Sequence, residues 1–237
     1  MINRDKKITI LTNLALMMII TVVCVISFIP QTSVPIYGGK RFSAIYNGNR
    51  NKANVSVMFN VYENTEIVNS IIDTLNEYDA KATFFVGGCG ADDNETTLKR
   101  IVQEGHELAN HGYFHKDHKK LNYENNRQEI ENTGIIVKAL SGVKMTLFAP
   151  PSGSYSETTL EVAYDLGYKV IMWSKDTIDW RDKNSSIVFD RATKNLTNGD
   201  LILMHPKEHT LQALPRILEF ISNSGYKTVC VSENIAD

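Results

Sequence analysis

Short apolar runs alternate with amphipathic stretches from about residue 54 to the end of the chain. An apolar run of four or five residues is typical of a buried strand, and apolar residues three and four apart predict a helix. Asn94 is placed to cap one helix, and Gly167 and Gly225 each end another. The predicted strands are Val55–Phe59, Ala82–Val86, Glu107–Asn110, Met145–Phe148, Lys169–Trp173, Asp200–Met204 and Lys227–Val231. The predicted helices are Thr65–Tyr78, Asn94–Glu104, Tyr123–Leu140, Ser156–Leu166, Ser185–Leu196 and Leu211–Ser224.

This alternation indicates the fold class. Strands connected by helices form right-handed βαβ units around a parallel sheet. Seven or eight units favour a barrel over a doubly wound sheet, and neither a dinucleotide-binding glycine fingerprint nor a Walker loop follows any predicted strand. We therefore expect an α/β protein, a distorted parallel (β/α)7-8 barrel, whose active site lies at the carboxyl ends of its strands.

The N-terminus has a different character. A basic flank precedes an uncharged span, Ile8–Ile29, that is long enough to cross a bilayer. Basic residues before such a span keep the N-terminus in the cytoplasm. The sequence thus predicts a transmembrane signal anchor over residues 1–30, a turn-rich linker over residues 31–53 and an extracytoplasmic domain over residues 54–237. The alternative is a cleaved signal peptide and a secreted domain.

Composition excludes little beyond nucleic-acid binding. The net charge is −2, with 43% hydrophobic and 22% charged residues, so the chain has no basic surplus that would bind nucleic acid. Of the three cysteines, Cys89 and Cys230 lie in the predicted domain. Their spacing does not require a disulfide, and two free thiols are the simpler interpretation.

Polar residues follow four of the predicted strands. His111 and His115, four residues apart, can turn both imidazoles toward one divalent ion, although this spacing also arises by chance. The other candidate segments are Ala149–Gly153, Asp176–Trp180 and Met204–Pro206. Because the carboxyl ends of parallel strands meet at one end of a barrel, we expect these residues to gather there.

These segments resemble, in order and spacing, the motifs of the polysaccharide deacetylase family, the NodB homology domain. The resemblance starts near Asn54, and the segments that carry it are Ala80–Val86, Gly105–His111 with His115, Asp176–Trp180 and Leu201–His205. It implies a metal-dependent hydrolase that removes N-acetyl groups from a cell-envelope polysaccharide such as peptidoglycan.

The resemblance also implies roles for individual residues. In that family one aspartate and two histidines hold a divalent metal such as zinc, and the match places His111 and His115 as ligands. His205 corresponds to the general acid and Asp179 to the carboxylate that orients it. The residues matched to the substrate groove are Trp180 and Leu203.

The chain departs from the family at its first strand. That strand ends T-F-D-D-G in the family, with the base and metal aspartates adjacent, whereas Asn60 and Val61 stand at these two positions here. Ala149 replaces the arginine that pairs with the base, and an arginine without its carboxylate would be a costly unpaired charge. Glu63 is the nearest acid and could serve as substitute base or ligand, or simply as an acid at a helix start.

Two functions follow from this combination. The retained histidines and the Asp179–Trp180 pair favour a metal-dependent deacetylase, which is the preferred interpretation. The missing carboxylates favour the alternative, a catalytically inactive deacetylase-like protein that binds glycan or has a structural role in the envelope. Both imply an N-acetylated glycan and the membrane as partners.

Overall fold

The computed structural model describes residues 6, 13–21, 36–37, 40–62 and 65–236, and it divides into two compact units, residues 1–41 and 42–237. In the first unit, residues 13–21 are helical, and β1 (Ile36–Tyr37) pairs antiparallel with β2 (Lys40–Arg41). No helix among these described residues is both long and apolar enough to span a membrane. The predicted span Ile8–Ile29 lies partly outside the described residues.

The second unit is built on a parallel sheet of eight strands. The strands run in the order β7-β6-β5-β4-β3-β9-β8, and β10 pairs with β3. Within the described residues β7 and β8 do not pair, so the barrel is open between them. The strands are β3 (Asn54–Val61), β4 (Ala82–Val86), β5 (Glu107–Asn110), β6 (Leu147–Phe148), β7 (Lys169–Val170), β8 (Lys175–Asp176), β9 (Leu201–Met204) and β10 (Lys227–Thr228). The predicted parallel α/β architecture is confirmed, as a partly open barrel.

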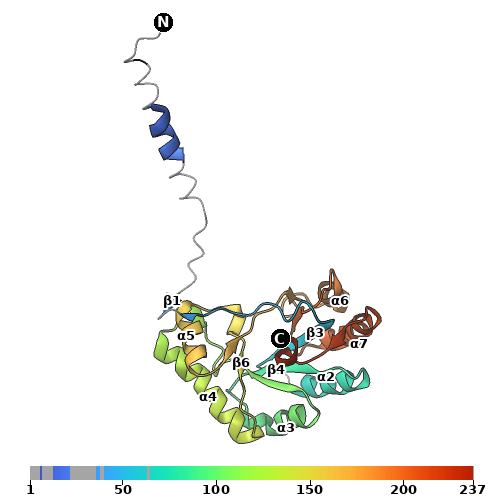
Figure 1. The fold of residues 1–237 in the computed structure, drawn as a ribbon. Coiled ribbons are helices and arrows are strands. Elements are labelled where there is room, and N and C mark those ends of the chain that lie inside the picture. Colours follow the sequence, from blue (N-terminus) through green and yellow to red (C-terminus); the bar gives the residue numbers. More distant parts are fainter. Residues whose placement is uncertain (1–5, 7–12, 22–35, 38–39, 63–64, 237) are drawn as a thin grey trace. The chain divides into compact units, whose positions relative to one another are not determined.

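Helices surround the outside of this sheet (Figure 1). They follow the strands in the alternation that the sequence predicts, and one short helix follows β10 where the last strand was expected to continue. The helices are α2 (Thr65–Glu77), α3 (Glu95–Gln103), α4 (Tyr123–Ser141), α5 (Glu157–Asp165), α6 (Ser185–Thr193), α7 (Glu208–Asn223) and α8 (Val231–Asn234).

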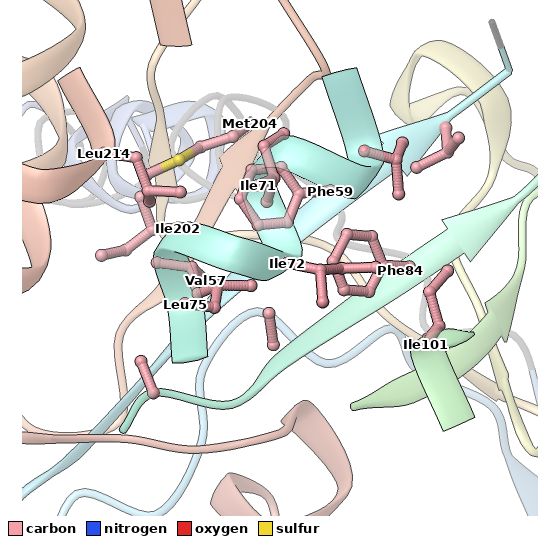
Figure 2. Close-up of a cluster of buried hydrophobic side chains, with 14 of the residues drawn as sticks. Val57, Phe59, Ile71, Ile72, Leu75, Phe84, Ile101, Ile202, Met204 and Leu214 are labelled. Carbon is pink, nitrogen blue, oxygen red and sulfur yellow. The ribbon is translucent and has the colours of Figure 1, made fainter. Parts of the chain in front are cut away.

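The largest apolar cluster lies between the sheet and the helices. Figure 2 shows Ile71 and Ile72 of α2 against Phe59 of β3 and Phe84 of β4, all fully buried, and the two phenyl rings stack with centroids 5.3 Å apart. Burying a side chain of this size contributes about 1.5–3 kcal/mol. Successive side chains of a strand point to opposite faces, so Met58 lies in a second cluster inside the barrel.

Residues 42–53, which we assigned to the linker, pack on this unit. The Ile45 amide donates to the Val170 carbonyl oxygen at 2.8 Å, and Ile45 accepts from the Met172 amide at 2.8 Å. Three residues further along, the Gly48 amide donates to the Gly199 carbonyl oxygen at 2.7 Å. The compact unit therefore begins at Phe42 rather than at Asn54. The side chains of Phe42 and Ile45 join apolar clusters of this unit, and Arg50 forms an ion pair with Asp200 at 3.1 Å.

Candidate functional site

A groove of about 760 Å³ opens at the carboxyl ends of the strands. Its size is in the range of about 300–1,000 Å³ that is usual for ligand sites. Six different strands deliver side chains to it, either from their last residues or from the loops that follow. The lining residues are Asn60, Tyr62, His111, Phe114, His115, Ser152, Trp173, Asp176, Trp180, Leu203, His205, Pro206 and Lys207. The structure thus brings together the candidate residues that follow β5, β8 and β9.

The two histidines of the β5 loop lie side by side. The ring centroids of His111 and His115 are 5.2 Å apart, with the planes at 72°. Nδ1 of His111 is 2.8 Å from the carbonyl oxygen of Ala149 and must donate to it, which leaves Nε2 without a proton in the neutral ring. Burial lowers the pKa of His111 to about 3 and lowers that of His115. Both imidazoles are therefore neutral at pH 7.

A buried carboxylate outside the groove fixes the loop that carries His115. Glu129 of α4 is 3% exposed, and its Oε2 accepts from the amides of Tyr113 and Phe114 at 2.9 and 2.7 Å. Its Oε1 forms an ion pair with Lys116 at 2.9 Å. His115 itself has a φ of 54°, in the left-handed region that side chains seldom adopt. Such strain persists where the surrounding contacts hold the backbone in place.

His205, which also lines the groove, forms a close pair with Asp179. Oδ1 of Asp179 accepts from Nδ1 of His205 at 2.7 Å, and Oδ2 accepts from the His205 amide at 2.7 Å and from the Thr210 hydroxyl at 2.6 Å. Nε2 of His209 donates to the Asp179 carbonyl oxygen at 2.7 Å. Burial alone would raise the pKa of Asp179, but the bonds from His205 and Thr210 outweigh it, and the pKa is lowered. Asp179 is thus an ionised, fully bonded carboxylate.

The end of β3 places only one of its two substituted residues in the groove. Asn60 faces the groove, 5% exposed, and its Oδ1 has no hydrogen-bond partner among the described residues. Val61 packs into the apolar cluster between sheet and helices. Ala149 is fully buried inside the barrel. Glu63, the candidate substitute base or ligand, lies outside the described residues.

Aromatic side chains form much of the rim. Trp180, predicted for the groove, is 55% exposed, and Leu203 forms part of the floor at 2% exposed. Phe114 and Tyr62, 54% and 42% exposed, line the groove as well. The sequence motifs do not include these two aromatics, although each lies within four residues of a strand end, which is the signal that would have found them. Half-exposed aromatic rings around a cavity are typical of binding sites.

The donor set does not complete a metal centre. His111 and His115 fit as neutral ligands on one side of the groove. A catalytic zinc site usually has three protein ligands, however, and in the part of the chain that the structure describes no group of three or more His, Cys, Asp or Glu could hold an ion.

The sequence matches a family model over residues 47–171, described as polysaccharide deacetylase. The match covers more than half of the chain and includes β3 to β7 with both histidines of the β5 loop. The chain belongs to the polysaccharide deacetylase family. The resemblance inferred from the motifs is confirmed, and the chain is a divergent member.

The relatives of this chain include an uncharacterized protein and a deacetylase. The chain is 34% identical to the uncharacterized protein YlxY of Bacillus subtilis over 189 residues, which is 80% of this chain and 59% of YlxY. It is 30% identical to a peptidoglycan-N-acetylglucosamine deacetylase of Bacillus cereus over 195 residues, 80% of this chain and 71% of that enzyme. The chain thus spans about three fifths of the length of YlxY and about seven tenths of the length of the deacetylase.

The polysaccharide deacetylase fold also appears in a solved pseudoenzyme. BA3943 from Bacillus anthracis, described as a CE4 family pseudoenzyme, superimposes with a TM-score of 0.80 and 32% identity, over 84% of this chain and 70% of that one. A mutant of BA3943 described as having restored enzymatic activity superimposes equally well, at 30% identity. Members of this family with one fold therefore include both active and inactive proteins.

Proposed function

We propose that this polysaccharide deacetylase domain binds an N-acetylated cell-envelope glycan in its groove without hydrolysing it. The observation that carries the proposal is the residue at the base position of the groove. The family has an aspartate there, and this chain has the carboxamide of Asn60. A carboxamide has no basic site at ordinary pH, so it cannot take a proton from water. With Val61 turned into the apolar cluster, β3 offers no carboxylate to a metal either.

The parts of the groove that would hold a ligand are intact. Trp180 and Phe114 expose their rings at the rim, and His205 stays bonded to Asp179. Sugar rings present apolar C–H faces and polar edges, and an aromatic ring beside hydrogen-bonding side chains complements both. The likeness to a CE4 pseudoenzyme supports binding without turnover, and the deacetylases among the relatives support a peptidoglycan-type ligand.

Glycan binding is tested by titrating the full chain with N-acetylglucosamine oligomers and by sedimentation with peptidoglycan. Trp180→Ala should weaken binding about tenfold or more, as truncation of a central aromatic contact does. Tyr78→Ala is the matched control, because Tyr78 is also an exposed aromatic residue but lies outside the groove. Equal affinity of wild type and Trp180→Ala would contradict the proposal, and so would acetate release from these glycans by wild type.

A metal-dependent deacetylase is the second candidate function, and the Asp179–His205 pair favours it. A carboxylate 2.7 Å from Nδ1 orients the imidazole, as a general acid requires. On this interpretation a divalent ion such as zinc binds at His111 and His115, and Glu63 supplies the missing base or ligand. Acetate release that is lost in both His205→Ala and Glu63→Gln would establish this function.

We also propose that residues 1–30 anchor the protein in the membrane and hold the domain outside the cytoplasm. The support is the basic flank before the uncharged span Ile8–Ile29. Protease added to intact cells should then release the domain, while cytoplasmic proteins stay intact. A domain that becomes accessible only after lysis would show that this orientation is wrong, and a domain found free in the medium would favour the cleaved signal peptide.

A further inference from the structure

Asn60 brings a buried carboxamide with an unpaired oxygen to the groove. The residue lines the groove and is 5% exposed, and in the part of the chain that the structure describes its Oδ1 has no hydrogen-bond partner. A buried acceptor without a partner is costly, because it has given up its hydrogen bonds to water. Such groups are uncommon in native proteins. At the wall of a groove, a bound ligand is the natural source of the missing partner.

The neighbouring side chains do not supply this partner. Asn60 is in register with Phe85 of β4, whose side chain is apolar. Ala149 is fully buried, and its methyl group has no donor where the family has an arginine. Nδ1 of His205, which also lines the groove, is bonded to Asp179. Among the described residues, the fold therefore makes no use of the Asn60 oxygen.

An N-acetyl group is the chemical complement of this carboxamide. A carboxamide has one acceptor oxygen and one NH₂ donor group. Its last torsion is soft and roughly two-fold, so a half-turn exchanges the oxygen and the nitrogen, and no bond to the oxygen opposes that turn. The acetamido group of a sugar likewise carries one N–H donor and one carbonyl acceptor. Either end of the Asn60 amide thus has a partner in an acetamido group.

We infer, on the basis of the proposed glycan binding, that Asn60 is a specificity-determining residue whose carboxamide hydrogen-bonds to the acetamido group of the glycan. A sugar with a hydroxyl at the same carbon has no amide carbonyl and no amide N–H, so it leaves the carboxamide without its complement. On this inference the position of the family's base selects the acetamido group rather than helping to remove it.

The test compares two ligands by calorimetry on the full chain. One is an N-acetylglucosamine oligomer, and the other is a glucose oligomer of the same linkage and length, with hydroxyls in place of the acetamido groups. Wild type should bind the acetylated oligomer about tenfold or more tightly, because a site with a polar group left unpaired rejects the analogue that lacks its partner. Asn60→Leu and Asn60→Ala should lose most of this preference and keep an affinity for the glucose oligomer close to that of wild type.

Stability separates recognition from a structural role of Asn60. Leucine is similar in shape and has no polar atom to leave unpaired, so Asn60→Leu should keep or raise the urea midpoint of unfolding. Asn126→Leu is the matched control, because Asn126 is also a buried asparagine outside the groove, but its Nδ2 donates to three backbone carbonyl oxygens. This control should lower the midpoint. Far-UV circular dichroism shows whether Asn60→Leu folds, and Asn60→Ala decides the preference if it does not.

Three outcomes would overturn the inference. One is an unchanged preference for the acetylated oligomer in a folded Asn60 variant. Another is a midpoint that falls as far in Asn60→Leu as in Asn126→Leu, since the carboxamide would then have a structural role. The third is equal affinity of wild type for both oligomers, which leaves glycan binding itself intact. Wild type that binds neither oligomer would overturn the proposed function as well, so the two failures are distinguishable.

Discussion

Replacing Asp179 by asparagine should destabilise the protein strongly, although the two side chains have the same shape. Asp179 is 1% exposed and accepts three hydrogen bonds, two from His205 and one from Thr210. The amide retains one acceptor oxygen and turns an NH₂ group toward donors. Net contributions of hydrogen bonds to charged groups are about 1.5–3 kcal/mol each, so losing at least one and weakening the others should cost about 2–4 kcal/mol.

The measurement is urea unfolding of the full chain at pH 7, followed by far-UV circular dichroism. Asp182→Asn is the matched control, because Asp182 pairs with the neighbouring Arg181 and with Arg191 of α6, but its side chain is 26% exposed. Partly exposed ion pairs contribute less than buried ones, so this variant should lose less stability than Asp179→Asn. Equal losses of stability in Asp179→Asn and Asp182→Asn would refute the reasoning that burial makes the Asp179 bonds strong.

The pH dependence gives an independent check on Asp179. Its pKa in the folded protein is lowered below the ordinary value of about 3.9, so the carboxylate contributes stability above about pH 4. That contribution disappears as the pH falls through the lowered folded pKa. The stability difference between wild type and Asp179→Asn should therefore narrow as the pH falls below about 4. A difference that does not narrow below about pH 4 would contradict an ionised Asp179.

Two further predictions concern other buried polar residues. Glu129→Ala should lower the free energy of unfolding by about 2–3 kcal/mol, because two amides of the β5 loop lose their acceptor, and it should also weaken glycan binding. Lys116→Ala should lower the free energy of unfolding less, since Lys116 is half-exposed. Urea unfolding measures the stability of both variants, and the glycan titration measures binding. Burial lowers the pKa of His106 to about 4, below the ordinary 6.5, so the folded state loses stability as the pH falls from about 6.5 to 4. His106→Asn retains an acceptor for the Ala82 amide and should remove this part of the acid sensitivity, and an unchanged pH profile in thermal unfolding would contradict it.

The hydrophobic pattern was sufficient for the strands that carry most of the core. The predicted bounds of β4 and β5, Ala82–Val86 and Glu107–Asn110, agree with the structure. In β4 the nearly continuous apolar run marks a strand that is covered on both faces. The pattern could not reveal β8 (Lys175–Asp176), which is two polar residues long and is defined by its pairing with β9. Such a strand depends on tertiary contacts rather than on local preference.

In the candidate site, too, some residues could be identified from the sequence and others only from the structure. His111, His115, Asp179 and His205 were identified because they match the motifs of the polysaccharide deacetylase family. The residues that hold them were missed because their sequence context is ordinary. Glu129 looks like a solvent-facing acid on an amphipathic helix, yet the β5 loop covers it and supplies two amides. Only the packing of α4 against that loop distinguishes it from the exposed acids of the same helix.

The end of β3 illustrates why a motif match by position predicts site residues less well than the face of the strand on which each residue lies. By position, Asn60 and Val61 both replace carboxylates, which suggests two equivalent losses. In the pleated strand they point in opposite directions, Asn60 into the groove and Val61 into the cluster that contains Phe59. A carboxylate at position 61 would have to leave that apolar cluster or be buried without a partner, at a cost of several kcal/mol. The chemistry that β3 offers to this groove is therefore governed by position 60.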